Sequence, residues 1–456
     1  MRTTLLNPAV WVLATTAAIA AAGAWRGRTA RESLETMVGF ATMWPVLMAL
    51  CAMSAAGIGS RAVLGFLAPG AYAEEVAAAR TFLSERGLYS DDGRAEVHEL
   101  MGESGAAALP WAGLPGISGC QVNAITNRAQ FFTNHAHTPM LLLAGVPLVS
   151  LGGSRGLYLL LLLLSCAAVL AMSAIAINRA GFVWNSRPAI LTLAVIAGWQ
   201  PVLAGVRQGD AVLTAAGLVA VAWYLVGVAD LRAPLAAALA SCLALPAIGV
   251  LPALARNAPR AAGLALLIFS AAAGATAFVA GPEIFPAFIR TAAQTATSYA
   301  FAPQNYGVAG RLAATGAGGP LLLAALAAAL VCTWWCARTI DHAFAAFVAL
   351  GLLVAPVVWS QHLALVFVPA LVLLTAVIVR GSAATLATWS ALVLMLSLPD
   401  IAVEKLGALV GAGVWGPTFP ILPVILVAFW VWTVFPLASR RPSAATAPDD
   451  ALGVTL

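Results

Sequence analysis

Apolar runs of about twenty residues alternate with short polar breaks along most of the chain, and a run of that length is enough to cross the ~30 Å hydrocarbon core of a membrane as a helix. The pattern therefore predicts an all-α fold, a polytopic transmembrane helical bundle of about 12 to 13 spans. The predicted spans lie near residues 9–25, 38–57, 137–152, 156–177, 188–205, 211–230, 234–253, 261–280, 318–337, 342–358, 362–380, 383–398 and 419–437.

Two breaks between the apolar runs are much longer than the others, at residues 58–136 and 281–317. Residues 73–88 and 285–299 show helical spacing, and we expect both segments to lie as helices at the membrane interface. The stretch from Arg61 to His137 also holds eight of the 18 acidic residues and three of the five histidines. This loop is therefore the first place to look for chemistry or binding. These residues are Glu74, Glu75, Glu85, Asp91, Asp92, Glu96, Glu99, Glu103, His98, His135 and His137.

Composition excludes a water-soluble domain. Hydrophobic residues make up 62% of the chain and charged residues 9%, and the mean hydropathy is +0.94. Soluble proteins carry roughly 25% charged residues. No basic cluster is dense enough for a nucleic-acid surface. The six cysteines are scattered, which predicts buried free thiols and no metal framework.

The chain divides into three predicted parts. The first apolar run is followed by no small-residue cleavage site, so we interpret it as a retained helix. Residues 1–37 then form an extra N-terminal transmembrane helix with its cytoplasmic loop, and residues 38–438 form the membrane domain. Residues 439–456 form a polar, disordered cytoplasmic tail.

Arginines in the short breaks predict the orientation, because cytoplasmic loops carry an excess of Lys and Arg. The arginine-rich breaks are placed inside, which makes the C-terminus cytoplasmic and puts residues 58–136 and 281–317 together on the outer face. The inside group is Arg26, Arg28, Arg31, Arg155, Arg207, Arg256, Arg260, Arg338, Arg380, Arg440 and Arg441. The outer group is Arg179, Arg187, Arg232 and Lys405.

Four short stretches stand out by their residues and order. The first is Val76-Ala77-Ala78-Ala79-Arg80-Thr81-Phe82-Leu83 with Gly87-Leu88-Tyr89, and the second is Gln200-Pro201-Val202-Leu203 with Arg207-Gln208-Gly209-Asp210. The third is Asn305-Tyr306-Gly307-Val308-Ala309-Gly310-Arg311-Leu312, and the fourth is Ala355-Pro356-Val357-Val358-Trp359-Ser360-Gln361-His362. In this order and spacing, they resemble elements of glycosyltransferase family 87.

That family consists of multispanning enzymes of the GT-C type that use polyprenyl-phosphate sugars. The resemblance implies transfer of a mannose- or arabinose-class sugar from such a donor to a cell-envelope glycolipid or polysaccharide, at the outer face of the cell membrane and without a further cofactor. The chain departs from the family at several positions. Ala71 stands where the catalytic aspartate is expected, Gln361-His362 replaces a histidine pair, and Gly307 replaces a serine. The lysine of a mid-bundle helix has no counterpart.

Sugar transfer from a lipid phosphate needs a base for the acceptor hydroxyl and donors or cations for the leaving phosphate. Glu74 and Glu75 are the first carboxylates after the second span and are the candidate bases. Their alternative role is the solvated face of an amphipathic helix. Arg311 could bind the phosphate or extend to the lipid headgroups. His362 could hold the phosphate or move a proton, or it could cap a helix.

Asn305 completes the candidate phosphate-binding set, and His137 and Trp359 are the candidate substrate-binding residues. His135 and His137 are two residues apart without a third ligand at fixed spacing, so no metal site is predicted. Gln208-Gly209-Asp210 falls on the cytoplasmic side of the predicted topology, which favours a helix-break role for it.

Two other functions stay open at this point. A transporter or flippase of a lipid-linked envelope precursor usually has ionisable residues in mid-membrane and internal repeats, and neither is evident here. A catalytically silent relative would explain Ala71. In every case the expected partners are membrane lipid, with the polyprenyl-phosphate sugar and envelope glycan for the enzyme, and no nucleic acid.

Overall fold

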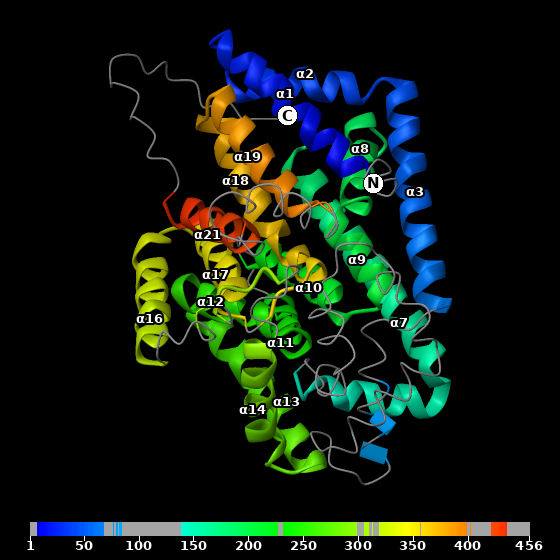
Figure 1. The fold of residues 1–456 in the computed structure, drawn as a ribbon, viewed down its shortest axis with the longest axis vertical. Helices are drawn as coiled ribbons and strands as arrows, with labels where there is room; N and C mark the ends of the chain where they lie inside the picture. The colour runs from blue at the N-terminus through cyan, green and yellow to red at the C-terminus, as the bar shows by residue number, and fades with distance from the viewer. Residues whose placement is uncertain are drawn as a thin grey trace, which may run out of the picture.

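The computed structural model describes residues 7–67, 76, 79–80, 82–83, 138–226, 231–298, 305–309, 312, 319–355, 357–398, 402 and 421–435. Within these ranges every regular element is a helix, which confirms the predicted all-α class (Figure 1). The elements are α1 (Pro8–Trp25), α2 (Ala30–Ala41), α3 (Trp44–Leu67), α7 (Leu141–Arg179), α8 (Arg187–Ala197), α9 (Gln200–Gln208), α10 (Ala211–Leu225), α11 (Arg232–Leu243), η3 (Leu245–Gly249), α12 (Val250–Asn257), α13 (Pro259–Ala280), α14 (Ile284–Ser298), α16 (Gly319–Cys336), α17 (Ile340–Val354), η4 (Ser360–Val366), α18 (Phe367–Arg380), α19 (Ala383–Leu396) and α21 (Ile421–Val434).

Several helices are long and apolar enough to cross a membrane. There are five in the described part of the chain: Pro8–Trp25, Trp44–Leu67, Arg155–Arg179, Pro259–Ala280 and Ser360–Arg380. The pair α8–α9, bent by 53°, adds a sixth if it counts as one span. The remaining apolar helices have 10–17 residues, and at ~1.5 Å per residue none of these alone covers ~30 Å. A helical bundle with several potential spans is thus confirmed, while the larger number of crossings stays a prediction.

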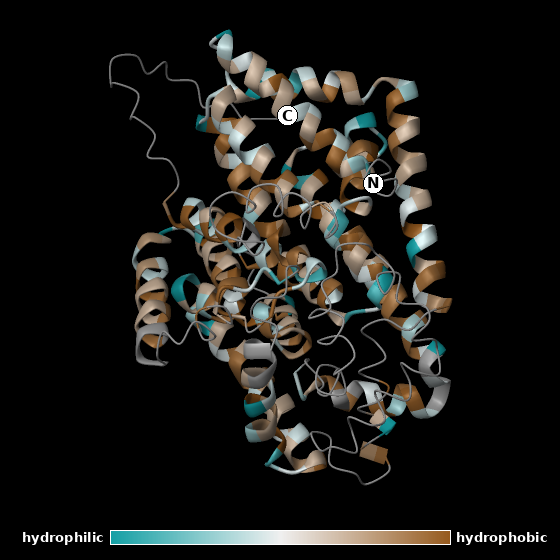
Figure 2. Ribbon diagram, viewed as in Figure 1, coloured by the Kyte–Doolittle hydropathy of each residue, from teal (hydrophilic) through white to brown (hydrophobic). Residues whose placement is uncertain are grey.

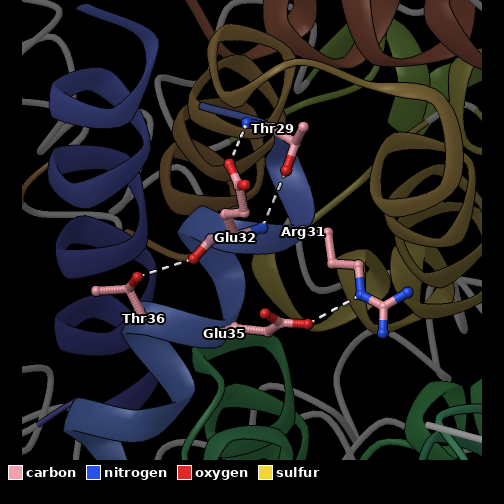
Figure 3. A network of polar contacts seen from close by, with 5 residues as sticks. All are labelled: Thr29, Arg31, Glu32, Glu35 and Thr36. Atoms are coloured by element: carbon pink, nitrogen blue, oxygen red, sulfur yellow. Dashed lines mark hydrogen bonds and ion pairs between the residues drawn. The ribbon is translucent and has the colours of Figure 1, made fainter. Parts of the chain in front are cut away.

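The amphipathic helix α2 separates the first two long helices. Thr29 Oγ1 accepts a hydrogen bond from the Glu32 backbone N–H (3.2 Å), and Glu32 Oε2 accepts one from the Thr29 N–H (2.9 Å), which forms a capping box (Figure 3). Arg31 pairs with Glu35 on the exposed face (Nε–Oε1 2.9 Å). Pro45, in the first turn of α3, suits a new helix start. The predicted span 38–57 is therefore displaced toward the C-terminus, to Trp44–Leu67.

One end of the bundle, which we call the loop end, gathers described residues from both long breaks. α3 ends there at Leu67. Val76 and Ala79 are buried in one apolar cluster with Tyr158 and Ala211. Phe82 packs against Ile284 at the start of α14, whose bounds agree closely with the helix predicted at 285–299.

The opposite end, which we call the arginine end, is where α1 and α2 meet α18 and α19. The Ala383 N–H donates to the Arg28 carbonyl (3.2 Å). The Arg187 guanidinium lies 4.8 Å from the ring centre of Trp44, at the first residue of α3. Farther along, the Arg179 guanidinium lies 4.5 Å from the Trp223 ring centre. Its Nη2 is also 3.7 Å from Asp341 Oδ1.

The structure corrects part of the predicted arginine topology. The segment predicted as a span at 137–152 is not a separate crossing, because it is the first part of α7, before a break at Gly153 (φ 61°). From that point on, each connection between helices therefore lies at the end of the bundle opposite to the predicted one. Arg155 lies 5.4 Å from the Phe66 ring centre, and Arg207 lies beside Gly65. Both arginines are thus at the loop end, whereas Arg179 and Arg187 are at the arginine end.

The α11–η3–α12 segment returns the helix connections that follow it to their predicted ends of the bundle. The predicted single span at 234–253 is instead two short helices joined by η3. α11 runs to the loop end, where Thr138 Oγ1 donates to the Cys242 carbonyl. Gly249 in η3 then packs against the backbone of Phe347 in α17, and α12 leads away to the start of α13.

Large apolar side chains are exposed on the outer helices, as expected for a surface covered by lipid rather than water. Met48 and Leu67 of α3, Phe278 of α13, and Leu323 and Trp335 of α16 are each more than half exposed. Figure 2 shows the corresponding hydrophobic colouring along α3 and α16.

Candidate functional site

The turn between α9 and α10 is the centre of the candidate site. Gly209 adopts a left-handed conformation there (φ 62°, ψ 40°), which glycine accommodates without steric cost. Asp210 follows as the N-cap of α10, and its Oδ1 accepts a hydrogen bond from the Val212 N–H (2.9 Å). Only 2% of Asp210 is exposed. The turn therefore buries a carboxyl group at the loop end.

The short helix η4 contacts this turn. Gln361 Nε2 donates to Asp210 Oδ2 (3.3 Å), which joins residues 151 positions apart in the chain. Ser360 and Gln361 are both buried. α17 and α18 are antiparallel neighbours that leave and return to the arginine end, and η4 is the turn between them. The second and fourth of the stretches that carry the family resemblance thus meet directly.

The third stretch is held against the fourth by Asn305. Its Oδ1 accepts hydrogen bonds from the Gly307 N–H (2.7 Å) and the Val358 N–H (3.0 Å). The Tyr306 N–H donates to the Val358 carbonyl (2.8 Å). Asn305 and Tyr306 are completely buried. Asn305 Oδ1 thus fixes the backbone before η4, and the predicted binding of the donor phosphate by Asn305 stays a prediction.

His362 and Trp359 lie in the same turn at the start of η4. The Trp359 N–H donates to His362 Nδ1 (3.0 Å). A neutral His362 imidazole therefore carries its proton on Nε2, which is the nitrogen able to donate to a phosphate oxygen. Both side chains are partly exposed. The predicted roles of His362 and Trp359 in binding phosphate and substrate stay predictions.

The first stretch completes the convergence. Val76 and Ala79 pack in the same cluster as Ala211, the residue after Asp210. Tyr158 belongs to that cluster and places its hydroxyl 3.0 Å from both the Ala62 and Val206 carbonyls, linking α7 to α3 and α9. Described residues of all four stretches therefore gather around the α9–α10 turn, although they are spread from residue 76 to residue 362.

Four of the predicted site residues lie outside the described residues: Glu74, Glu75, His137 and Arg311. Their described neighbours are at the loop end. Val76 is two residues after Glu74 and is buried there, and Thr138, next to His137, is bonded to the end of α11. Within the described ranges, no group of three or more His, Cys, Asp and Glu side chains could hold a metal ion.

No protein-family model matches this sequence, and no curated protein or solved structure is detectably similar to it. The assignment of the site consequently depends on its own residues and geometry.

Asp210 lies at the opposite end of the bundle from the one predicted for it. The predicted topology put Gln208-Gly209-Asp210 on the cytoplasmic side, opposite His362, whereas the structure places Asp210 in contact with the residue before His362. The error follows from the extra crossing assigned to 137–152. A local signal for the turn was present, because Gly-Asp before an apolar run combines a left-handed C-cap with an N-cap, but nothing local indicates Gln361 as its partner.

Chemically, the arrangement combines a fixed imidazole with a rigid polar turn at one end of an apolar bundle. Asp210 and Asn305 are used by backbone and side-chain hydrogen bonds, so they hold the site together. His362 is the described side chain best suited to bind an anion or transfer a proton, since it is partly exposed and its tautomer is set by Trp359.

Proposed function

We propose that this protein is an integral membrane glycosyltransferase. It transfers a mannose- or arabinose-class sugar from a polyprenyl-phosphate donor to a cell-envelope glycolipid or polysaccharide at the loop end. The observation that supports this most is the convergence of the four family-87-like stretches at the α9–α10 turn. The formation of separate apolar helices does not by itself require these particular residues to meet.

In the proposed mechanism, Glu74 or Glu75 accepts the proton of the acceptor hydroxyl, and His362 and Arg311 stabilise the leaving phosphate. Trp359 and His137 contact the sugar or the acceptor. Val76, two residues after Glu74, is buried in the same apolar cluster as Ala211, the residue after Asp210. Ala71 requires one of these glutamates to replace the family's aspartate.

The loop end is proposed to face outward and the arginine end to face the cytoplasm, because arginine is concentrated at the arginine end. Among the described residues, that end includes Arg26, Arg28, Arg31, Arg179, Arg187, Arg232, Arg256, Arg260, Arg338 and Arg380, against Arg61, Arg80, Arg155, Arg207 and Arg290 toward the loop end. The proposed cytoplasmic side of the C-terminus follows from the same orientation.

A transporter or flippase of a lipid-linked precursor is the second candidate. Two observations favour it: the 53° break between α8 and α9, and the buried carboxyl group of Asp210 near that broken helix. Transporters often build their binding sites from such discontinuous helices.

The decisive assay incubates membranes containing the protein with radiolabelled polyprenyl-phosphate mannose or arabinose and follows transfer of label to lipid and polysaccharide acceptors. Glu74→Gln, Glu75→Gln and His362→Ala are each expected to reduce turnover by about tenfold or more if they act as proposed. His342→Ala, at the arginine end, is the matched histidine control and retains turnover. Absence of transfer with both donors, together with translocation of a lipid-linked sugar in proteoliposomes, would replace the enzyme with the transporter.

A further inference from the structure

We infer that Asp210 is a positioning residue, whose carboxylate ties η4, and with it His362, to the α9–α10 turn. Its effect on turnover rests on the proposed function, whereas the contact itself does not. Asp210 and His362 are far apart in the chain, and the hydrogen bond from Gln361, the residue before His362, links Asp210 to η4.

Each oxygen of Asp210 contacts a different element. Oδ1 accepts from the Val212 N–H and caps α10, while Oδ2 accepts from Gln361 Nε2 in η4. Serine, threonine and asparagine cap helices about as well as aspartate, and a buried charge costs more than a buried neutral group. Capping alone therefore does not account for an aspartate here. The second oxygen, directed at η4, is what aspartate provides beyond serine.

The conformation of η4 depends on contacts with other segments of the chain. It is a 3₁₀ helix of seven residues, whereas such helices rarely exceed about four residues because their hydrogen-bond geometry is poor. On one side, Asn305 and Tyr306 bond the backbone of Val358 just before it. On the other side, Asp210 bonds Gln361. Releasing the second contact removes a polar link between the α9–α10 turn and the residue before His362.

Gln361 occupies one position of the expected histidine pair, and its amide has a defined task in this chain. The amide donates to Asp210, and the next residue is His362. The polarity of this contact suggests a specific test. In Asp210→Asn with Gln361→Glu, the asparagine amide donates to the new carboxylate across the same contact, and its Oδ1 still caps α10.

The test compares four variants: Asp210→Ser, which keeps the cap but loses the second oxygen; Gln361→Glu, which places two carboxylates together; Asp210→Asn; and the double variant Asp210→Asn/Gln361→Glu. The first readout is the rate at which diethylpyrocarbonate modifies His362, followed by mass spectrometry of its peptide. His342, at the arginine end, is the internal control in every sample. The second readout is kcat and KM for sugar transfer.

Asp210→Ser, Asp210→Asn and Gln361→Glu each lose the donor–acceptor pairing of this contact, and each is expected to raise the modification rate of His362 by about tenfold, the equivalent of one lost hydrogen bond to a charged group. They leave His342 unchanged. The double variant returns His362 to the native rate. For transfer, the single variants lower kcat by about tenfold with a smaller change in KM, and the double variant recovers kcat.

Equal His362 modification in all variants, or a double variant no better than Gln361→Glu, would overturn the positioning role. If the native protein transfers no sugar, the proposed function fails, and the modification rates still decide whether Asp210 holds His362. If transfer occurs but Asp210→Ser has native kcat, the positioning role fails and the proposed function stands. Ser382→Ala, which removes the N-cap of α19 at the other end, controls for general loss of stability.

Discussion

Replacing Gly65 with alanine tests the close approach of α3 to the site. A Cβ atom at Gly65 would lie 2.6 Å from the Arg207 carbonyl oxygen and would also overlap the Tyr158 hydroxyl. The carbonyl belongs to the backbone of α9 and has no freedom to rotate away. Gly65→Ala must therefore move α3 away from the α9–α10 turn. A Cβ atom at Gly59, on the same helix, would meet no described atom of another element within 4 Å, so Gly59→Ala is the matched control.

The free energy of unfolding is expected to change in opposite directions for the two variants. Alanine stabilises a helix by roughly 1 kcal/mol over glycine, and this is the whole effect expected for Gly59→Ala. Overpacking at Gly65 costs roughly 1–3 kcal/mol. Displacement of the Tyr158 hydroxyl from the Ala62 and Val206 carbonyls costs about 1 kcal/mol more. Gly65→Ala is therefore destabilising by about 1–3 kcal/mol, and the two variants differ by about 2–4 kcal/mol.

The assay is thermal unfolding in detergent at one scan rate, followed by tryptophan emission. A fixed scan rate matters because membrane proteins commonly unfold irreversibly. Gly65→Ala should unfold several degrees below Gly59→Ala. Adding Tyr158→Phe to Gly65→Ala should cost less than Tyr158→Phe alone, since the phenyl ring lacks the hydroxyl that the new methyl group meets. A Gly65→Ala protein as stable as Gly59→Ala would refute the close packing of α3 against α9.

Two further predictions concern other parts of the bundle. Gly351→Ala in α17 places a Cβ atom against the Pro246 carbonyl of η3, so we expect the free energy of unfolding to fall by about 1–3 kcal/mol. Gly274→Ala in α13 is the control, because a Cβ atom there has nothing within 4 Å, and it should be neutral or stabilising in the same thermal unfolding assay. Equal stability of the two variants would contradict the contact between η3 and α17. At the arginine end, hydrogen bonds from the Thr29 backbone and side chain, aided by the charge of Arg28, hold the pKa of Glu32 below its ordinary value of 4.5. A depressed folded-state pKa gives stability that is present above 4.5 and is lost as the pH falls through the folded value. Glu32→Gln keeps an acceptor for the capping box and should therefore flatten the dependence of the melting temperature on pH below about 4.5; an unchanged acid profile would show that the capping box is not formed.

The sequence was sufficient for features that depend on local composition. The helices at Pro8–Trp25, Arg155–Arg179 and Pro259–Ala280 match the predicted runs 9–25, 156–177 and 261–280 closely, because a long apolar run with polar ends has few alternatives to a helix in lipid. The helix Ile284–Ser298 was predicted from its amphipathic spacing in the same way.

The apolar pattern does not encode the direction in which each segment runs through the bundle. The run at 137–152 has the composition of a span, yet it ends at the positive-φ break of Gly153 and remains at the loop end. The run at 234–253 contains Pro246, and it forms two short helices around η3. Each of these changes reverses the side assigned to the residues that follow. The first change misplaced Arg155, Arg179, Arg187, Arg207 and Arg232 and assigned Asp210 to the wrong end, and the second returned the residues from Arg256 onward to their predicted end.

Two reversals of chain direction, one at the start of α7 and one at η4, explain how the site is built. Because the first part of α7 stays at the loop end, the α8–α9 pair must end there, and this brings the α9–α10 turn beside Val76 and Ala79. Because α17 turns back at η4, Gln361 reaches the same place from the opposite direction. The contact between Asp210 and Gln361 joins these two reversals. A residue that neither the apolar pattern nor the charge distribution of the loop singles out is thus the one on which the position of His362 depends, and Asp210→Ser is the substitution that separates this arrangement from a site built by the first loop alone.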